Sequence, residues 1–336
     1  MVVRFPGTLR RFILALAVLL IVPTTVAPQS PAYDSFFAFG DSLADVGNIF
    51  VSSQALGLNP PFPPSASPHR AYFQGRFSNG PVAFEYLWER LSGQAPGSPG
   101  GLQPSVLFPA LPPQAAVGFA YGATGVGVLD PIPGGFVAPG LLGQIQLFGS
   151  MLTGPPSERA LYAIITGANE YGGAGSDPHD VVDAIAVGIR ALYALGARNI
   201  LVATLPDLSD IPINALSDQK ALSKLTKEHN RLLKHALHDL RAELEEVNLI
   251  EFDVNDALKK TLPRETDPIT PALDVFFPPE LFPAGFRMSI CVFNPVTCLD
   301  APTFNVGLQY QFWDAFHPTT EVHRLIGEAM SETLTR

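Results

Sequence analysis

The chain has 336 residues, of which 47% are hydrophobic and 15% are charged, and its formal net charge is −10 at pH 7. This composition provides ample apolar material for a core and argues against a disordered chain. Because the chain is acidic overall and its Lys/Arg clusters in sequence, such as Lys259 and Lys260, are short and interrupted, nucleic acid is not expected as a partner. The length predicts one large domain, since α/β enzymes often reach this size as a single unit.

Residues 1–29 have the layout of a signal peptide. Three arginines precede an apolar run from Phe12 to Val22, and small residues follow up to Ala27. The run is shorter than the about 20 apolar residues that span a bilayer. We therefore expect cleavage and release of residues 30–336 as a secreted, extracellular or periplasmic protein, with an uncleaved anchor as the alternative. No cysteine stands at the expected cleavage site, which disfavours a lipoprotein.

Short apolar runs alternate with segments of helical periodicity along the rest of the chain. Strands are expected at Ser35–Phe39, Ala116–Tyr121, Leu161–Thr166, Asn199–Thr204 and Leu249–Asp253. The clearest helices are expected at Val181–Leu195, Ser217–Val247 and Thr320–Leu334. This alternation predicts a parallel sheet covered by helices.

Three proline-rich segments interrupt the pattern: Asn59–His69, Pro104–Pro113 and Pro263–Pro283. Proline is incompatible with a helix interior or a central strand, so we expect long surface loops. Loops between strands of an open sheet frame the substrate site at its carboxyl edge. Phenylalanines in these loops could line an apolar acyl pocket, or they could belong to the core.

Cys291 and Cys298 are the two cysteines, and six residues separate them in a loop-like stretch. An exported protein meets an oxidising environment, so a local disulfide is expected. The alternative, a metal pair, lacks a nearby histidine or further cysteine.

The strongest local signal for chemistry is FFAFGDSLADVGN, in which an apolar strand ends at Gly40 and Ser42 falls on the following turn. A serine in this position is exposed at the edge of the sheet. Backbone N–H groups at the start of the next segment would point toward an oxyanion formed there. Ser42 is therefore a candidate nucleophile, although a serine after such a turn can also be a helix N-cap.

Asp314 and His317 lie three residues apart, directly before the last expected helix. A neutral imidazole can take the proton of a serine through one nitrogen while a carboxylate holds its other nitrogen. The spacing allows one loop to present both groups. An ordinary surface turn before a helix is the competing interpretation.

Two further glycine-containing strand ends supply candidate oxyanion donors. Asn169 follows the strand in YAIITGANEYGG, and Gly122 with Ala123 follows the strand in VGFAYGATG. An amide side chain and a backbone N–H at these places can meet a developing oxyanion. Each pattern alone is equally typical of a simple turn.

These four blocks resemble, in order, those of the GDSL or SGNH hydrolase family: FGDS at Phe39–Ser42, the glycine of FAYGATG, GAN at Gly167–Asn169, and Asp314-x-x-His317. GRFSNG at 75–80 and ATLPDL at 203–208 also resemble the longer branch of plant esterases and bacterial extracellular lipases and phospholipases. The resemblance covers nearly the whole mature chain. It implies a three-layer α/β/α, flavodoxin-like fold and a serine esterase that uses neither metal nor organic cofactor.

The resemblance also implies the role of each site residue. Ser42 is the nucleophile, His317 the base and Asp314 the group that orients it, while Ser42 N–H, Gly122 and Asn169 donate to the oxyanion. Two departures stand out: many relatives have Gly-Gly where this chain has Gly122-Ala123, which leaves open which N–H faces the oxyanion, and Glu170 replaces an aspartate. Three further matching residues are interpreted as structural supports of the nucleophile turn: Asp45, Gly47 and Asn48.

Other catalytic patterns are missing from the sequence, which has no G-x-S-x-G, Walker loop or H-E-x-x-H. The remaining histidines are interpreted as scattered or solvent-facing: His69, His179, His229, His235, His238 and His323. A metal site at His235 and His238, which share a helical face with acidic residues, is disfavoured.

The prediction is a secreted esterase or lipase that hydrolyses carboxylic esters through an acyl-enzyme, acting on a small-molecule or lipid ester and contacting lipid interfaces transiently. Alternatives with the same site are an acyltransferase or a phospholipase. An alternative from another class is an inactive carbohydrate- or lipid-binding protein.

Overall fold

A computed structural model describes residues 1–3, 32–112, 114–132, 135–172, 175–276 and 306–335 of the chain. The predicted signal peptide and both cysteines lie almost entirely outside these ranges, so export and the disulfide stay predictions. Within the described ranges, no helix combines the length and apolar character needed to cross a bilayer.

A six-stranded, entirely parallel sheet forms the centre of the domain, with the strand order β2-β3-β1-β6-β7-β8. Its strands are β1 (Ser35–Gly40), β2 (Gln103–Pro104), β3 (Ala116–Gly118), β6 (Ala160–Ile165), β7 (Asn199–Ala203) and β8 (Asn248–Phe252). A separate antiparallel hairpin consists of β4 (Asp130–Ile132) and β5 (Phe136–Ala138). Because both faces of the main sheet are covered, its central strands are continuous apolar runs, and every residue of β1 and β6 is buried.

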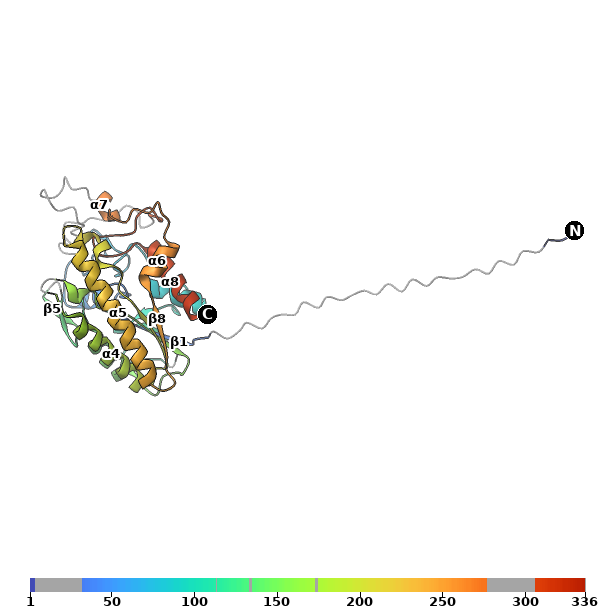
Figure 1. Cartoon of the computed structure of the whole chain (residues 1–336), viewed down its shortest axis with the longest axis horizontal. Helices are drawn as coiled ribbons and strands as arrows, with labels where there is room; N and C mark the ends of the chain where they lie inside the picture. Colours follow the sequence, from blue (N-terminus) through green and yellow to red (C-terminus); the bar gives the residue numbers. More distant parts are fainter. Residues whose placement is uncertain (4–31, 113, 133–134, 173–174, 277–305, 336) are drawn as a thin grey trace. The chain divides into compact units, whose positions relative to one another are not determined.

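Helices cover the sheet on both faces, and the side chains of β1 alternate between the two resulting cores. Phe37 and Phe39 pack in one core, whereas Phe36 and Ala38 pack in the other. The first core is closed by α3 (Leu141–Met151), α4 (Pro178–Ala194) and α5 (Gln219–Glu243). The second is closed by α2 (Ala83–Ser92), α6 (Val254–Thr261) and α8 (Thr320–Leu334). Figure 1 shows α4 and α5 lying side by side on one face, with α6 and α8 on the other. The predicted three-layer α/β/α fold is confirmed.

The five expected strands and three expected helices are confirmed; the helix at Thr320–Leu334 has the expected bounds, and each of the others has at least one shifted end. The described parts of the proline-rich segments are only partly loops, and residues 277–283 of the third segment lie outside the described ranges. Pro104 lies in β2, which is an edge strand. Proline is tolerated there because an edge strand has no neighbour on its outer side to which an N–H would donate. The remaining elements are short: α1 (Asn48–Ala55), α7 (Ala272–Phe276), η1 (Ser105–Leu107), η2 (Asn169–Tyr171), η3 (Leu208–Asp210) and η4 (Pro212–Asn214).

The strand order creates a crevice beside β1. From β1 the chain goes to β2 and β3 on one side of the sheet, and from β3 it crosses back to β6 on the other side. In open parallel sheets, such a switch of direction leaves a crevice at the carboxyl ends of the strands concerned, where ligands bind. Ser42 follows β1 and Asn169 follows β6, so the topology places both at this crevice.

Candidate active site

The turn after β1 is constrained by contacts that only glycine allows. Gly40 has φ 143°, and a Cβ there would lie 1.9 Å from the carbonyl oxygen of Ile165. The buried amide of Gln144 holds this residue from the other side, since Gly40 N–H donates to Oε1 (2.9 Å) and Nε2 donates to the Gly40 carbonyl (2.8 Å). Ser42 therefore leaves the sheet in one fixed direction. Gln144, on the buried face of α3, was not singled out in the sequence.

The structure brings together Ser42, His317 and Asp314. His317 Nε2 lies 2.8 Å from Ser42 Oγ, and its Nδ1 lies 2.7 Å from Asp314 Oδ2. A hydrogen on Nδ1 and a lone pair on Nε2 satisfy both contacts at once. Asp314 Oδ1 also accepts the backbone N–H groups of Phe316 and His317, at 2.8 and 2.7 Å. The three-residue spacing thus folds into a turn that presents the imidazole to Ser42.

Tyr72 completes the surroundings of Asp314. Its hydroxyl donates to Oδ2 over 2.6 Å, and both residues are fully buried. Burial raises the pKa of Asp314, but the charge of His317 and the hydrogen bonds from His317, Tyr72 and Phe316 outweigh it, so the pKa is lowered overall. Asp314 is therefore an anion at neutral pH. No sequence signal marked Tyr72, because 242 positions separate it from Asp314.

Asp45 organises the turn after Ser42, as expected. Its carboxylate accepts the N–H groups of Gly47 and Asn48, each at 2.7 Å, directly where α1 begins. The same carboxylate accepts the Gly122 N–H at 2.8 Å. Because the Gly122 N–H already donates to Asp45, the geometry does not favour it as an oxyanion donor. The neighbouring Ala123, with φ 64°, lines the cavity beside Ser42 instead.

Asn169 begins η2 and lines the same cavity. Its Nδ2 donates one hydrogen to the Thr124 carbonyl at 2.9 Å, which leaves a second hydrogen for another acceptor. Glu170 binds the adjacent backbone, because its Oε1 accepts the Val126 N–H at 2.6 Å. Glutamate in place of aspartate therefore still connects this strand end to the loop that carries Ala123.

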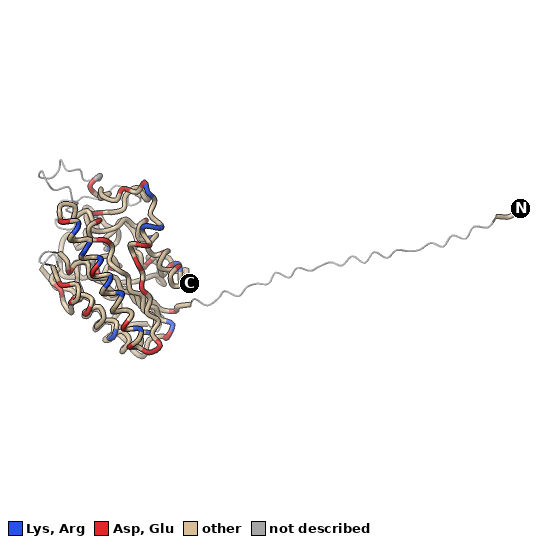
Figure 2. The backbone as a smooth tube through the Cα atoms, in the orientation of Figure 1, with Lys and Arg blue, Asp and Glu red and all other residues tan. Residues whose placement is uncertain are grey.

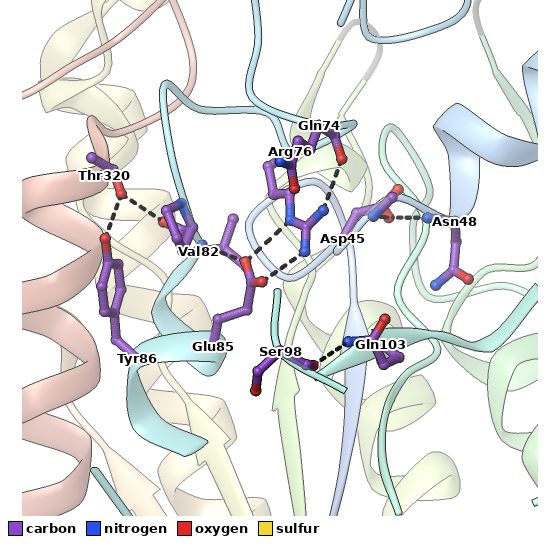
Figure 3. Close-up of polar contacts among 12 residues, drawn as sticks. Asp45, Asn48, Gln74, Arg76, Val82, Glu85, Tyr86, Ser98, Gln103 and Thr320 are labelled. Atoms are coloured by element: carbon purple, nitrogen blue, oxygen red, sulfur yellow. Dashed lines mark hydrogen bonds and ion pairs between the residues drawn. The ribbon is translucent and has the colours of Figure 1, made fainter. Parts of the chain in front are cut away.

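The GRFSNG segment supports the histidine turn from the opposite side. Ser78 Oγ donates to the Pro318 carbonyl (2.8 Å), and the ring of Phe77 lies 5.0 Å from that of His317. Arg76 and Glu85 form a buried ion pair at 2.7 Å, and Figure 3 shows the guanidinium reaching both Glu85 and the Gln74 carbonyl. This segment is thus structural support for His317.

Two histidines are placed differently from the expectation of solvent exposure. His229 and His323 are buried, with 0% and 2% of their surfaces exposed. The Tyr171 hydroxyl lies 2.7 Å from His229 Nδ1, and the Ala83 N–H donates to His323 Nδ1 over 3.2 Å. Burial lowers the pKa of His229 to about 4, and burial with the nearby charge of His317 lowers that of His323 to about 3. Both are neutral packing residues. In the described ranges, no group of histidine, cysteine or acidic side chains could hold a metal ion.

A cavity of about 300 Å³ opens beside Ser42 and His317. Its wall is mainly apolar and continues between α6 and α8. Residues that contribute apolar surface include Leu43, Phe62, Phe84, Ile165, Leu208, Val254, Leu258, Phe316, Val322 and Ile326. Phe62 comes from the first proline-rich segment, so one of the three expected loops is confirmed as part of the wall. Most of the strand phenylalanines belong to the core instead.

A parallel α/β sheet with serine, histidine and aspartate aligned at its carboxyl edge is an architecture of hydrolytic enzymes. The model of the family described as GDSL-like Lipase/Acylhydrolase matches residues 36–330. The chain belongs to this family, which confirms the resemblance seen in the sequence. It is accordingly a carboxylic ester hydrolase of the GDSL type, whose chemistry is ester hydrolysis or acyl transfer.

Among characterised proteins, the chain is similar to a phosphatidylcholine-sterol acyltransferase of Aeromonas hydrophila, with 27% identity over 95% of this chain and 96% of the relative. A GDSL esterase/lipase of Arabidopsis thaliana is 28% identical over 89% and 86% of the two chains. Among solved structures, an acetyl-xylooligosaccharide esterase from Geobacillus aligns with a TM-score of 0.45 and 12% identity, covering 90% of this chain and 94% of the other.

Proposed function

We propose that the protein is an exported serine esterase or lipase in which Ser42, His317 and Asp314 act as a catalytic triad. The observation that carries the proposal is the continuous hydrogen-bonded line from Ser42 Oγ through both ring nitrogens of His317 to the buried Asp314 carboxylate. This arrangement lets His317 Nε2 take the proton of Ser42 while the Asp314 carboxylate holds the Nδ1–H and stabilises the imidazolium.

The reaction proceeds in two steps. Ser42 Oγ attacks the ester carbonyl while His317 Nε2 takes the hydroxyl proton, and collapse of the tetrahedral intermediate passes that proton to the leaving alcohol. Water then attacks the acyl-enzyme, again losing its proton to His317, and the acid leaves as Ser42 regains its hydroxyl. Asp314 stabilises the imidazolium throughout and keeps its own charge.

Three N–H donors are proposed for the oxyanion: the backbone amides of Ser42 and Ala123, and the second hydrogen of Asn169 Nδ2. This assignment transfers the donor role expected of Gly122 to Ala123, since Asp45 already accepts the Gly122 N–H. Loss of the Asn169 amide should cost on the order of a hundredfold to a thousandfold in kcat.

The acyl group is proposed to be an aliphatic chain of at least medium length. A cavity of about 300 Å³ with mainly apolar walls favours such a chain over a single acetyl group. Each buried methylene contributes about 0.8 kcal/mol. The specificity constant kcat/KM should therefore rise up to about fourfold per methylene until the cavity is filled.

The test is hydrolysis of p-nitrophenyl esters from C2 to C16 by the purified protein, its Ser42→Ala variant and a control, Ser150→Ala, which alters an exposed serine on α3. We expect activity that peaks beyond C2 in the wild type and the control and disappears in Ser42→Ala. Equal activity in all three proteins would exclude Ser42 as the nucleophile. A maximum at C2 would contradict the proposed acyl group.

Acyl transfer to an alcohol is a second candidate function, favoured by the similarity to a relative named as a phosphatidylcholine-sterol acyltransferase. Product analysis with added alcohols separates the two, since a transferase forms the new ester in preference to free acid. A fluorophosphonate probe tests the inactive binding protein, which would stay unlabelled. Export is proposed from the signal-peptide pattern, and the N-terminal sequence of the mature protein tests it.

A further inference from the structure

Five cationic side chains lie along one face of α5: Lys220, Lys224, Lys227, Arg231 and Lys234, here called the basic stripe. Their spacings of four and three residues place them on the same side of the helix. All five are exposed, whereas the opposite face is buried through Leu233, Leu237 and Leu240. Figure 2 shows blue segments following one another down this helix, although the whole chain carries a net charge of −10.

The basic stripe is largely unneutralised. Arg231 pairs with Glu228 at 2.6 Å on the same helix. In the parts of the chain that the structure describes, no ion pair joins the four lysines to a carboxylate. Like charges at these spacings repel one another and destabilise a helix. Lys224 and Lys227 lie near the Glu228 and Asp207 carboxylates, but among the described residues neither forms a close ion pair, so their ammonium groups stay available to an external anion.

The first turn of α5, where the stripe begins, also contributes to the wall of the active-site cavity. Leu222, in the first turn of α5, lines that cavity together with Asn214 from η4. Between them, Leu216 has 92% of its surface exposed. Leu222 lies two residues from Lys220 and therefore on the other side of the helix, so the stripe and the cavity flank the first turn of α5 from different sides, and the exposed Leu216 precedes this turn in the chain.

We propose that the basic stripe and Leu216 dock the enzyme on a lipid surface with anionic phosphate headgroups. The proposal rests on the lipase function proposed above, since docking would bring the enzyme to an insoluble ester. The stripe extends over about 21 Å at 1.5 Å per residue, so several headgroups can be bound at once. Each lysine near an anionic surface strengthens binding about fivefold, and salt screens this attraction.

The experiment measures co-sedimentation of the full-length mature protein with vesicles of phosphatidylcholine alone or with one-third phosphatidylglycerol. The stripe variant carries Lys220→Gln, Lys224→Gln, Lys227→Gln and Lys234→Gln. A matched control removes four exposed cations elsewhere: Arg90→Gln, Lys259→Gln, Lys260→Gln and Arg264→Gln. Both variants have the same net charge, so a difference between them does not arise from total charge.

We expect the wild type to bind anionic vesicles at least tenfold more tightly than neutral ones, with binding weakened by 0.5 M salt. The stripe variant should lose at least tenfold in affinity, and the control less than threefold. Equal losses in both variants, or equal binding of the wild type to neutral vesicles, would overturn the proposal.

Hydrolysis of a soluble p-nitrophenyl ester separates this proposal from the enzymatic one. The stripe variant should retain wild-type kcat/KM on the soluble ester and lose rate only on an ester held in anionic vesicles. If the wild type has no esterase activity, the proposed function fails, yet the vesicle measurement still decides whether the stripe binds lipid.

Discussion

Replacing Tyr72 with phenylalanine removes a single hydroxyl that donates to the buried Asp314 carboxylate over 2.6 Å. A hydrogen bond to a charged group contributes about 1.5–3 kcal/mol. If this contribution is needed to stabilise the imidazolium in the transition state, kcat should fall by about tenfold to about 150-fold, since 1.36 kcal/mol is a factor of ten. KM should change little, because Tyr72 does not line the cavity.

The same substitution has a defined pH signature. Tyr72 helps to hold the pKa of Asp314 below its usual value. A carboxyl with a lowered folded pKa contributes stability above its unfolded pKa of about 3.9, and this contribution is lost as pH falls through the folded pKa. Tyr72→Phe should therefore destabilise the protein most at neutral pH, and the difference from the wild type should shrink below about pH 4.

Tyr162→Phe is the matched control. The Tyr162 hydroxyl is buried on β6 and has no hydrogen-bond partner in the described structure. Removing it should leave kcat unchanged and stability unchanged or improved, because an unsatisfied polar group leaves the core. Denaturant unfolding at several pH values and steady-state kinetics measure both effects. Equal kcat for Tyr72→Phe and Tyr162→Phe would refute the role of Tyr72 in positioning Asp314.

Three other substitutions test the frame of the site. Gly40→Ala should abolish folding or cost more than about 4 kcal/mol, since its Cβ would overlap a carbonyl oxygen; circular dichroism and thermal unfolding report this. Arg76→Met should cost about 3–5 kcal/mol because it leaves the Glu85 carboxylate buried and unpaired, and adding Glu85→Gln should recover part of that loss in denaturant unfolding. Burial, with the charge of Asp314, raises the pKa of Asp274 to about 7. Between about pH 4 and 7 this carboxyl is ionised in the unfolded chain but protonated in the folded one, so the free energy of unfolding falls as pH rises. Asp274→Asn should therefore unfold at higher denaturant concentration than the wild type at pH 8 and at the same concentration near pH 3.5.

The sequence alone determined the layers of the fold and the residues at strand ends. Apolar runs such as 161–165 are buried on both faces, a local pattern that identifies parallel strands without knowledge of their neighbours. The Asp314-x-x-His317 spacing likewise specifies a local turn. Helices α2, α3 and α6 and the strand β2 were not predicted. These elements are short, and their apolar faces are recognised only once the sheet on which they pack is known.

Only the tertiary structure decided which groups surround those residues. Three hydrogen bonds of the site join segments 77 or more positions apart: Tyr72 to Asp314, Gly40 to Gln144, and Gly122 to Asp45. It also showed that His229 and His323 are buried, although the helical spacing of His229 with Leu233 and of His323 with Ile326 was a signal that the sequence interpretation missed. Local pattern specifies which face of an element is apolar, whereas the identity of a buried hydrogen-bond partner depends on how elements distant in sequence pack together.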